Sequence, residues 1–344
     1  MREIEEGMLG PTEGEIRGEM MTIEDNIDDA ASSLRGACAP FRGERPNFSE
    51  CSCTFFKTLT IKVGGWNDID EFCTHVLDNE IPILEVLRSI AAAGICTLVF
   101  ESTSLDFQLS GSPLLDQYRR HLLLRDGPAL LRDLDFVAHK SLISHANFLN
   151  QIIPGKAKEI GNQVVEVLLP IIDSSTSHSG TEAPGVSPGA AKPLDPEDDG
   201  DVSPIEAFQG AIENALKLRA QMALNGLKQY EFVYIPPETY FNPQTMNLNG
   251  QNYDSEALVS LSRYQFLRPA QMSQRTPSGL GQKVKLCLFP ALYSRRRPQF
   301  DPARSTEVDI GEILVQVRVF TEGRPDQDSE GDDLKLVTKA VVLV

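Results

Sequence analysis

The 344-residue chain is poor in several residue types, and each shortage excludes a class of protein. Six cysteines scattered over so long a chain do not form the dense pattern of a small disulfide scaffold. The N-terminus lacks a basic, apolar leader, and no stretch reaches the ~20 apolar residues of a bilayer-spanning helix. We therefore expect a soluble, reduced intracellular protein, cytoplasmic or nuclear, with no membrane partner.

Motifs that carry chemistry are equally sparse, since G-x-S-x-G, a Walker loop and C-x-x-C are all absent. His139 and His145 lie six residues apart, whereas two ligands on one helical face lie four apart. Cys38, Cys51 and Cys53 lack the paired short spacings of a zinc site. The sequence therefore predicts a non-enzymatic protein without metal or cofactor. The alternative is an enzyme whose site assembles from distant residues, with first candidates His121, Asp135, His139 and His145.

Negative charge is concentrated in three short segments. The net charge of the chain is −17, and residues 1–30, 182–201 and 322–333 carry −8, −5 and −5. The remainder is close to neutral, which disfavours a nucleic-acid partner held by phosphate neutralisation. Residues 173–202 are rich in Ser, Pro, Gly and Asp and have almost no large apolar side chain, so we predict a disordered linker there.

Residues 1–53 are predicted to be a largely disordered acidic tail that contains one short amphipathic helix at 20–35. Ile23, Ile27 and Leu34 recur on one face of that helix at three- and four-residue steps. Two interpretations remain open from the sequence. The helix either docks on a partner protein or packs on its own domain.

Residues 54–172 are predicted to form a helical domain. The β-branched run 55–63 favours a strand, and residues 95–100 fit either a buried strand or more helix. Gly94 and Pro170 are interpreted as helix stops. The periodicity predicts helices over 69–77, 83–94, 113–125, 128–151 and 156–169.

Residues 203–344 are predicted to form an α+β domain with an acidic loop at 322–333. Ser203 is a good N-cap and Pro204 suits the first helical position, and the helix fades by Gly226. Its apolar face includes Phe208 and Ile212. Strands are predicted over 230–235, 284–288, 313–320 and 334–344. The fold class is therefore α+β, with a mostly helical N-terminal region followed by a helix and a small antiparallel sheet.

The loop after the first predicted strand carries a short phrase, F-N-P-x-x-M, at Phe241 to Met246, and L-C-L-F-P-A-L follows at 286–292. This order resembles a set of fungal proteins that carry F-D-P-x-T-M and then L-C-L-F-P-A-L, a resemblance that implies no activity. It also resembles GrpE, the nucleotide-exchange cochaperone family, in which a long helix precedes a small β-domain whose loop carries F-D-P and then H-E-A. Here Asn242 stands for the Asp, Met246 stands for the His, and Glu-Ala is absent.

These observations lead to the hypothesis of an intracellular protein that binds or regulates other proteins. A GrpE-like cochaperone that releases nucleotide from a DnaK-type chaperone is the alternative that the second resemblance implies. The identity of the partner and the oligomeric state stay open. The candidate interface residues are Ile23, Ile27, Leu34, Phe208, Ile212, Phe241 and Met246.

Overall fold

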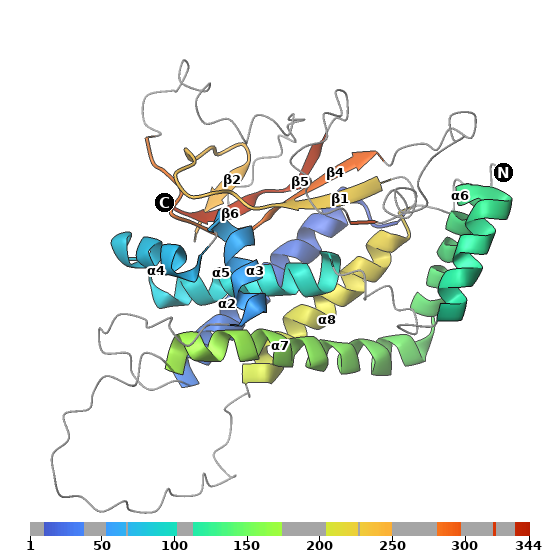
Figure 1. The fold of residues 1–344 in the computed structure, drawn as a ribbon, viewed down its shortest axis with the longest axis horizontal. Helices are drawn as coiled ribbons and strands as arrows, with labels where there is room; N and C mark the ends of the chain where they lie inside the picture. Colours follow the sequence, from blue (N-terminus) through green and yellow to red (C-terminus); the bar gives the residue numbers. More distant parts are fainter. Residues whose placement is uncertain are drawn as a thin grey trace, which may run out of the picture.

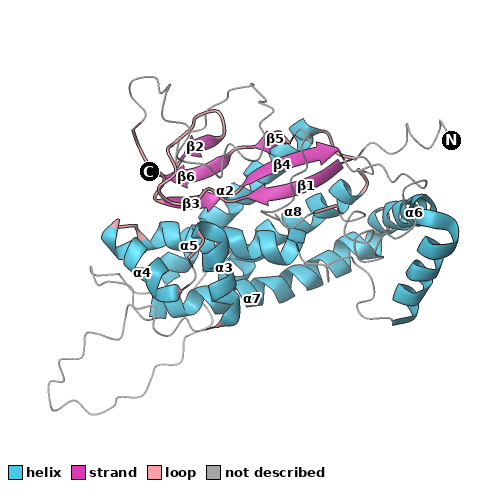
Figure 2. Ribbon diagram, turned by 45° about the horizontal axis from the view of Figure 1, so that its top comes forward, coloured by secondary structure: helices cyan, strands magenta, loops and turns pink. Residues whose placement is uncertain are grey.

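The fold is α+β, as the sequence predicts. Helices make up most of the computed structural model, and two small three-stranded sheets come from the C-terminal region (Figure 1). The sheets lie together on one side of the helices (Figure 2). The structure describes residues 10–37, 53–66, 68–101, 113–173, 204–225, 228–249, 281–296, 319–320 and 334–344.

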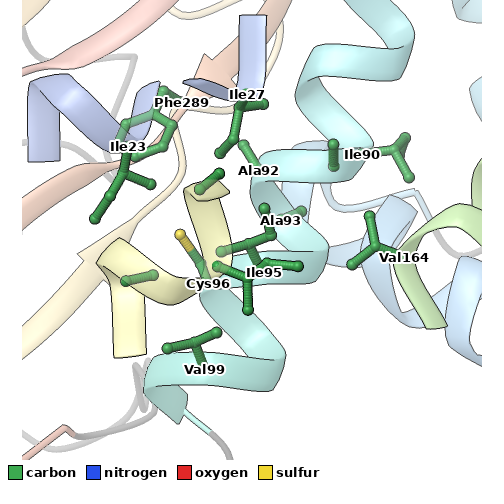
Figure 3. Close-up of a cluster of buried hydrophobic side chains, with 14 of the residues drawn as sticks. Ile23, Ile27, Ile90, Ala92, Ala93, Ile95, Cys96, Val99, Val164 and Phe289 are labelled. Atoms are coloured by element: carbon green, nitrogen blue, oxygen red, sulfur yellow. The ribbon is translucent and has the colours of Figure 1, made fainter. Parts of the chain in front are cut away.

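One apolar helix forms the centre of the molecule. α5 (Ile83–Ile95) continues without interruption into a π-helical segment, η2 (Cys96–Glu101). Residues 95–100 are therefore helical, and the predicted stop at Gly94 is wrong. An added Cβ at Gly94 would meet Val164 of α7 (Ile153–Asp173) at 3.5 Å and Leu59 of α3 (Thr54–Gly64) at 3.6 Å. Figure 3 shows side chains from α2 (Glu13–Ala37) and α7 converging on this helix.

The continuity of α5 and η2 also corrects the expectation that no stretch has the length of a membrane span. Ile83–Glu101 is 19 residues long and apolar enough to cross a bilayer by length and composition alone. Of its apolar window, 67% is buried inside the protein. A buried core helix can have the same length and composition as a membrane span. The predicted helix stop at Gly94 divides this stretch into two runs, each too short to span a bilayer.

The N-terminal helix is longer than predicted and belongs to the core. α2 (Glu13–Ala37) has 25 residues and packs along α8 (Pro204–Ala223) and α5. Its N-terminal end is tied to the sheet, because the carboxylate of Glu13 contacts Lys228 and Lys335, each at 2.6 Å. Arg17 also donates from Nε to the carbonyl oxygen of Val337 at 3.1 Å. Residues 13–37 therefore form a helix longer than the predicted 20–35 that packs on the core, and residues 1–9 and 38–52 of the predicted tail lie outside the described residues.

Residues predicted as the first strand form a helix instead. α3 (Thr54–Gly64) begins where the thiol of Cys53 accepts a hydrogen bond from the Phe56 amide at 3.3 Å. Phe56, Leu59 and Val63 are buried at helical spacing, so tertiary packing outweighs the strand preference of this β-branched run. The predicted helix at 69–77 is confirmed as α4 (Ile69–Asp78), capped by Asp68.

The predicted break between two helices near Gly127 is confirmed. α6 (Pro113–Ile143) has non-helical backbone at Gly127, with φ 84° and ψ 170°. A π-helical turn, η4 (Phe148–Ile152), then leads into α7 (Ile153–Asp173). Pro170 does not end α7 as predicted, because the helix continues through Ile171 and Ile172, which are buried.

The strands form two sheets, and the chain passes from one sheet to the other more than once. The first sheet has the order β1-β4-β5 and is antiparallel. The second has the order β2-β6-β3, with β2 parallel and β3 antiparallel to β6. The strands are β1 (Lys228–Val233), β2 (Met246–Leu248), β3 (Leu286–Phe289), β4 (Ala291–Arg296), β5 (Lys335–Thr338) and β6 (Ala340–Leu343).

Pro290 and Lys339 mark two of the points at which the chain passes between the sheets, and the segment between β1 and β2 makes a third. Pro290 separates β3 in the second sheet from β4 in the first, and Lys339 separates β5 in the first from β6 in the second. The single strand predicted over 334–344 is therefore two strands. Of the strand predicted at 313–320, only residues 319–320 are described, and Phe320 forms a bridge with Tyr230.

A single large hydrophobic cluster takes side chains from helices α2 to α5, α7 and α8 and from strands of both sheets, and Leu142 and Ile143 of α6 pack against it. The predicted regions 54–172 and 203–344 therefore share a core in this structure. A smaller second cluster lies within the strands and includes Phe241 and Met246. Asp173 lies at the end of α7, and the rest of the predicted linker and the acidic loop 322–333 lie outside the described residues.

Candidate functional site

The seven candidate interface side chains all lie inside the protein. Those of α2 and α8 belong to the main hydrophobic cluster, and the two that follow β1 belong to the second. Each is less than 9% exposed, so another protein can reach them only if the core opens. Their role as an interface stays a prediction. These residues are Ile23, Ile27, Leu34, Phe208, Ile212, Phe241 and Met246.

The structure describes the side chains of two of the four residues named for an enzymatic site. His121 and His145 are exposed, and the side chains of Asp135 and His139 are among those not described. His75 is structural, since its Nε2 lies 2.7 Å from the carbonyl oxygen of Lys285 in a bond that joins α4 to the sheet region. Within the described ranges, no three His, Cys, Asp or Glu side chains are grouped to hold a metal ion.

Two buried thiols and a phenol meet where α5 becomes π-helical. Cys96, Cys287 and the Tyr234 hydroxyl are all shielded from solvent. Burial raises the pKa of both thiols to about 12, and burial together with the two thiols raises the pKa of Tyr234. All three groups are therefore neutral at physiological pH. A buried, protonated thiol is a poor nucleophile, so this cluster is built for packing.

A polar network joins α2, α5 and the residue after β2. Arg88 donates from Nε to Asp28 at 2.9 Å, and from Nη1 to Glu85 and to Asn249, each at 3.0 Å. Asn249 in turn donates from Nδ2 to Glu85 at 2.9 Å. Residues far apart in sequence thus share one charge-assisted network at the edge of the core.

Glu24 lies beside this network, on α2. Burial, together with the smaller effects of the nearby Asp25 and Asp28, raises the pKa of its carboxyl to about 7, and Arg88 opposes the shift. A carboxyl with a pKa near neutrality is common at functional sites, but structural networks produce it too. Here burial beside two aspartates is enough to explain the shift.

The outer surface of α6 differs from the rest of the described surface. Leu130, Leu134 and Val137 recur at i, i+4 and i+7 and are 40%, 43% and 62% exposed. We call these three residues the α6 stripe. Tyr118 and Leu124 in the first half of the same helix are also exposed. Three large exposed apolar side chains at helical spacing, as in the α6 stripe, mark a surface suited to bind another protein.

The other side of α6 faces the protein. Leu131 is 1% exposed, and Leu142 packs against the main cluster, so the second half of the helix is fixed to the body on that side. The helix stands at one end of the molecule, away from the sheets (Figure 1). The stripe therefore points outward from a supported helix.

Comparisons with protein families, with curated proteins and with solved structures find no match to this chain. The two resemblances noted in the sequence stay predictions. The residues that carry them have structural positions, because Phe241 and Met246 are buried in the second cluster and Asn242 accepts hydrogen bonds within its own turn.

Sequence reasoning missed both the α6 stripe and the Arg88 network. Periodicity places Leu131, Leu134 and Leu142 on one face of a helix at 128–151, whereas the structure buries Leu131 and exposes Leu134. The spacing of Leu130, Leu134 and Val137 carried a second apolar stripe that could have been found. The Arg88 network spans more than 200 residues, and no local pattern signals it.

Proposed function

We propose that this protein is a non-enzymatic interaction or regulatory protein that binds another protein through the α6 stripe. The observation that carries the proposal is the exposure of Leu130, Leu134 and Val137 on one supported helical face. Burying such a stripe removes apolar surface from water, which drives association. A partner helix that presents its own i, i+3, i+4 and i+7 anchors fits this geometry.

The charge of α6 supports the same proposal. Residues 113–143 carry five basic and four acidic side chains, whereas the whole chain carries −17. An acidic partner that approaches α6 therefore meets less electrostatic repulsion than it would near the three acidic segments.

The proposal is tested by comparing proteins that co-purify with three forms of the full chain. The forms are the unmodified chain, a stripe variant (Leu130→Ser, Leu134→Ser, Val137→Ser) and a matched control (Ile61→Ser, Ile152→Ser) that removes exposed apolar side chains elsewhere. We expect the stripe variant alone to lose specific proteins by tenfold or more. The binding of each lost protein is then measured with purified components. Equal recovery by all three forms would contradict the proposal.

The other two classes predicted from sequence have their own tests. A GrpE-like exchange factor would accelerate nucleotide release from a DnaK-type chaperone, and the F-N-P-x-x-M resemblance predicts that the loop at 241–246 would be needed. An enzyme that uses His121 or His145 would lose turnover on their replacement without loss of thermal stability, since both side chains are exposed.

A further inference from the structure

We propose that the protein that binds the α6 stripe is acidic, and that its carboxylates pair with two arginines on the outward face of the first half of α6. The inference rests on the proposed function, because it names the chemistry of the partner of that same helix. It is carried by the order of the side chains around residues 117–126 and by the position of this segment beside the stripe.

The exposed side chains of the first half of α6 gather on one face. At 100° per residue, six of them fall within a sector of about 160°, and the buried Leu123 falls outside that sector. Among the described side chains of the sector, two are arginines and none is acidic, since Asp126 falls outside it. We call this surface the α6 basic face. It consists of Gln117, Tyr118, Arg120, His121, Leu124 and Arg125.

Both arginines of the α6 basic face can reach a partner. Arg120 is exposed, and the Arg125 side chain is 72% exposed. The Nε atom of Arg125 lies 3.8 Å from Asp126, which is longer than a hydrogen bond. A guanidinium carries five N–H donors in a planar fork, so Arg125 retains donors for the carboxylate of another protein.

The composition of the α6 basic face is typical of a protein interface. Tyr118 and Leu124 are 57% and 70% exposed and lie among the arginines. Tyrosine and arginine are enriched among the residues that contribute most to binding between proteins. Arginine also recognises carboxylates through paired hydrogen bonds. The face therefore offers apolar contact and two fixed positive charges to a partner with acidic side chains.

The charge of the whole chain favours a compact acidic protein over a membrane or a nucleic acid. The chain carries −17, so an extended anionic surface is repelled by the molecule as a whole. A short acidic helix interacts mainly with charges within about 8 Å at physiological salt, and on this face the described charges are positive.

The α6 basic face lies close enough to the α6 stripe for one partner to contact both. Arg125 and Leu130 are five residues apart, so their Cα atoms lie within about 18 Å of each other even though Gly127 interrupts the helix. A helix of about twelve residues has that length. A partner helix whose apolar anchors pack on the stripe therefore places its adjoining residues near Arg125, where glutamate or aspartate is favoured.

Fluorescence anisotropy of two labelled peptides with the full chain tests the inference. Both peptides are amphipathic helices with leucine at i, i+3, i+4 and i+7, and their other positions are mainly glutamate in one and glutamine in the other. The unmodified chain is expected to bind the glutamate peptide at least tenfold more tightly than the glutamine peptide. The basic-face variant (Arg120→Glu, Arg125→Glu) is expected to lose this preference. The matched control (Lys57→Glu, Lys158→Glu) changes the net charge equally at exposed lysines of α3 and α7 and is expected to keep it.

Two results with the peptides overturn the inference: a glutamate peptide that binds no more tightly than the glutamine peptide, or an equal loss of preference in the basic-face variant and the control. Circular dichroism verifies that each variant folds. Weaker co-sedimentation of the basic-face variant than of the unmodified chain with phosphatidylserine vesicles would assign the face to a membrane instead. Weaker self-association of that variant in sedimentation velocity would assign it to a second copy.

The inference and the proposed function fail separately. A chain that shows no preference for the glutamate peptide, but whose stripe variant still loses co-purifying proteins, would refute the acidic partner and leave the proposed function standing.

Discussion

Replacing Glu24 by glutamine should stabilise the protein at alkaline pH and change it little in mild acid. The carboxyl of Glu24 on α2 is largely buried, and its pKa is raised from 4.5 to about 7. Each pKa unit corresponds to about 1.4 kcal/mol of difference between the two protonation states. Ionised Glu24 therefore destabilises the folded state by about 3 kcal/mol when the pH lies above 7.

The direction of the pH effect depends on whether the folded or the unfolded chain holds the Glu24 proton more tightly. Below pH 4.5, Glu24 is neutral in both the folded and the unfolded chain, and its ionisation contributes nothing. Between pH 4.5 and 7 the unfolded chain loses the proton first, so stability falls as the pH rises. Above pH 7 Glu24 is ionised in both states, and its ionisation lowers the stability no further. Glutamine keeps the shape of the protonated carboxyl and removes this dependence.

Urea unfolding of the unmodified chain and of Glu24→Gln at pH 5 and pH 8 measures the effect. The free energy of unfolding should rise in the variant by about 3 kcal/mol at pH 8 and by less than about 1 kcal/mol at pH 5. The exposed Glu19→Gln on the same helix is the control and should change stability by less than about 0.5 kcal/mol at both pH values. An equal effect of Glu24→Gln at the two pH values would refute the reasoning.

Three further predictions address packing, ion pairing and thiol chemistry. Gly94→Ala should raise the free energy of unfolding by about 0.5–1 kcal/mol, because its Cβ would meet Val164 and Leu59 at ordinary contact distance inside a helix. Gly64→Ala should lower the free energy of unfolding, because its Cβ would overlap the Trp66 ring; urea midpoints of the two variants should move in opposite directions. Glu13→Gln weakens the contacts to Lys228 and Lys335. Because these contacts are partly exposed, the free energy of unfolding should fall by about 1 kcal/mol. A loss indistinguishable from zero would show that the contacts do not hold α2. A thiol reagent at pH 8 should label Cys53 in the native protein and reach Cys96 and Cys287 only after unfolding, as peptide mass spectrometry can show; native labelling of either buried thiol would contradict their placement.

Local sequence signals correctly predicted the elements whose ends carry a capping residue, a proline or a glycine. Asp68 before α4, Pro204 at the start of α8 and the break at Gly127 are all where the sequence places them. Gly94 and Pro170 failed as stops because packing on both sides of each position supports a continuous helix. A breaker residue alone therefore does not end a helix that the core holds in place.

Tertiary contacts determined the structure where the local sequence was compatible with more than one element. Residues 55–63 carry a strand composition, yet the burial of Phe56, Leu59 and Val63 against α5 makes them helical. The apolar run around Lys339 forms two strands because the residues before Lys339 pair with β4, whereas those after it pair with β2 and β3. The spacing of the apolar residues shows two stripes on α6, but which of them faces outward could not be predicted, because both Leu131 and Leu134 fit an inward stripe until the body of the protein is placed beside them.

The central claim is that the α6 stripe contacts a protein, and site-specific photo-crosslinking in the native source tests it most directly. A photo-crosslinking amino acid replaces Val137 in one variant and Ile61, an exposed apolar residue of α3, in another. The account predicts a discrete crosslinked product, either with a second copy or with another protein, from position 137 and none from position 61. Equal crosslinking at the two positions, or none at position 137, would contradict it.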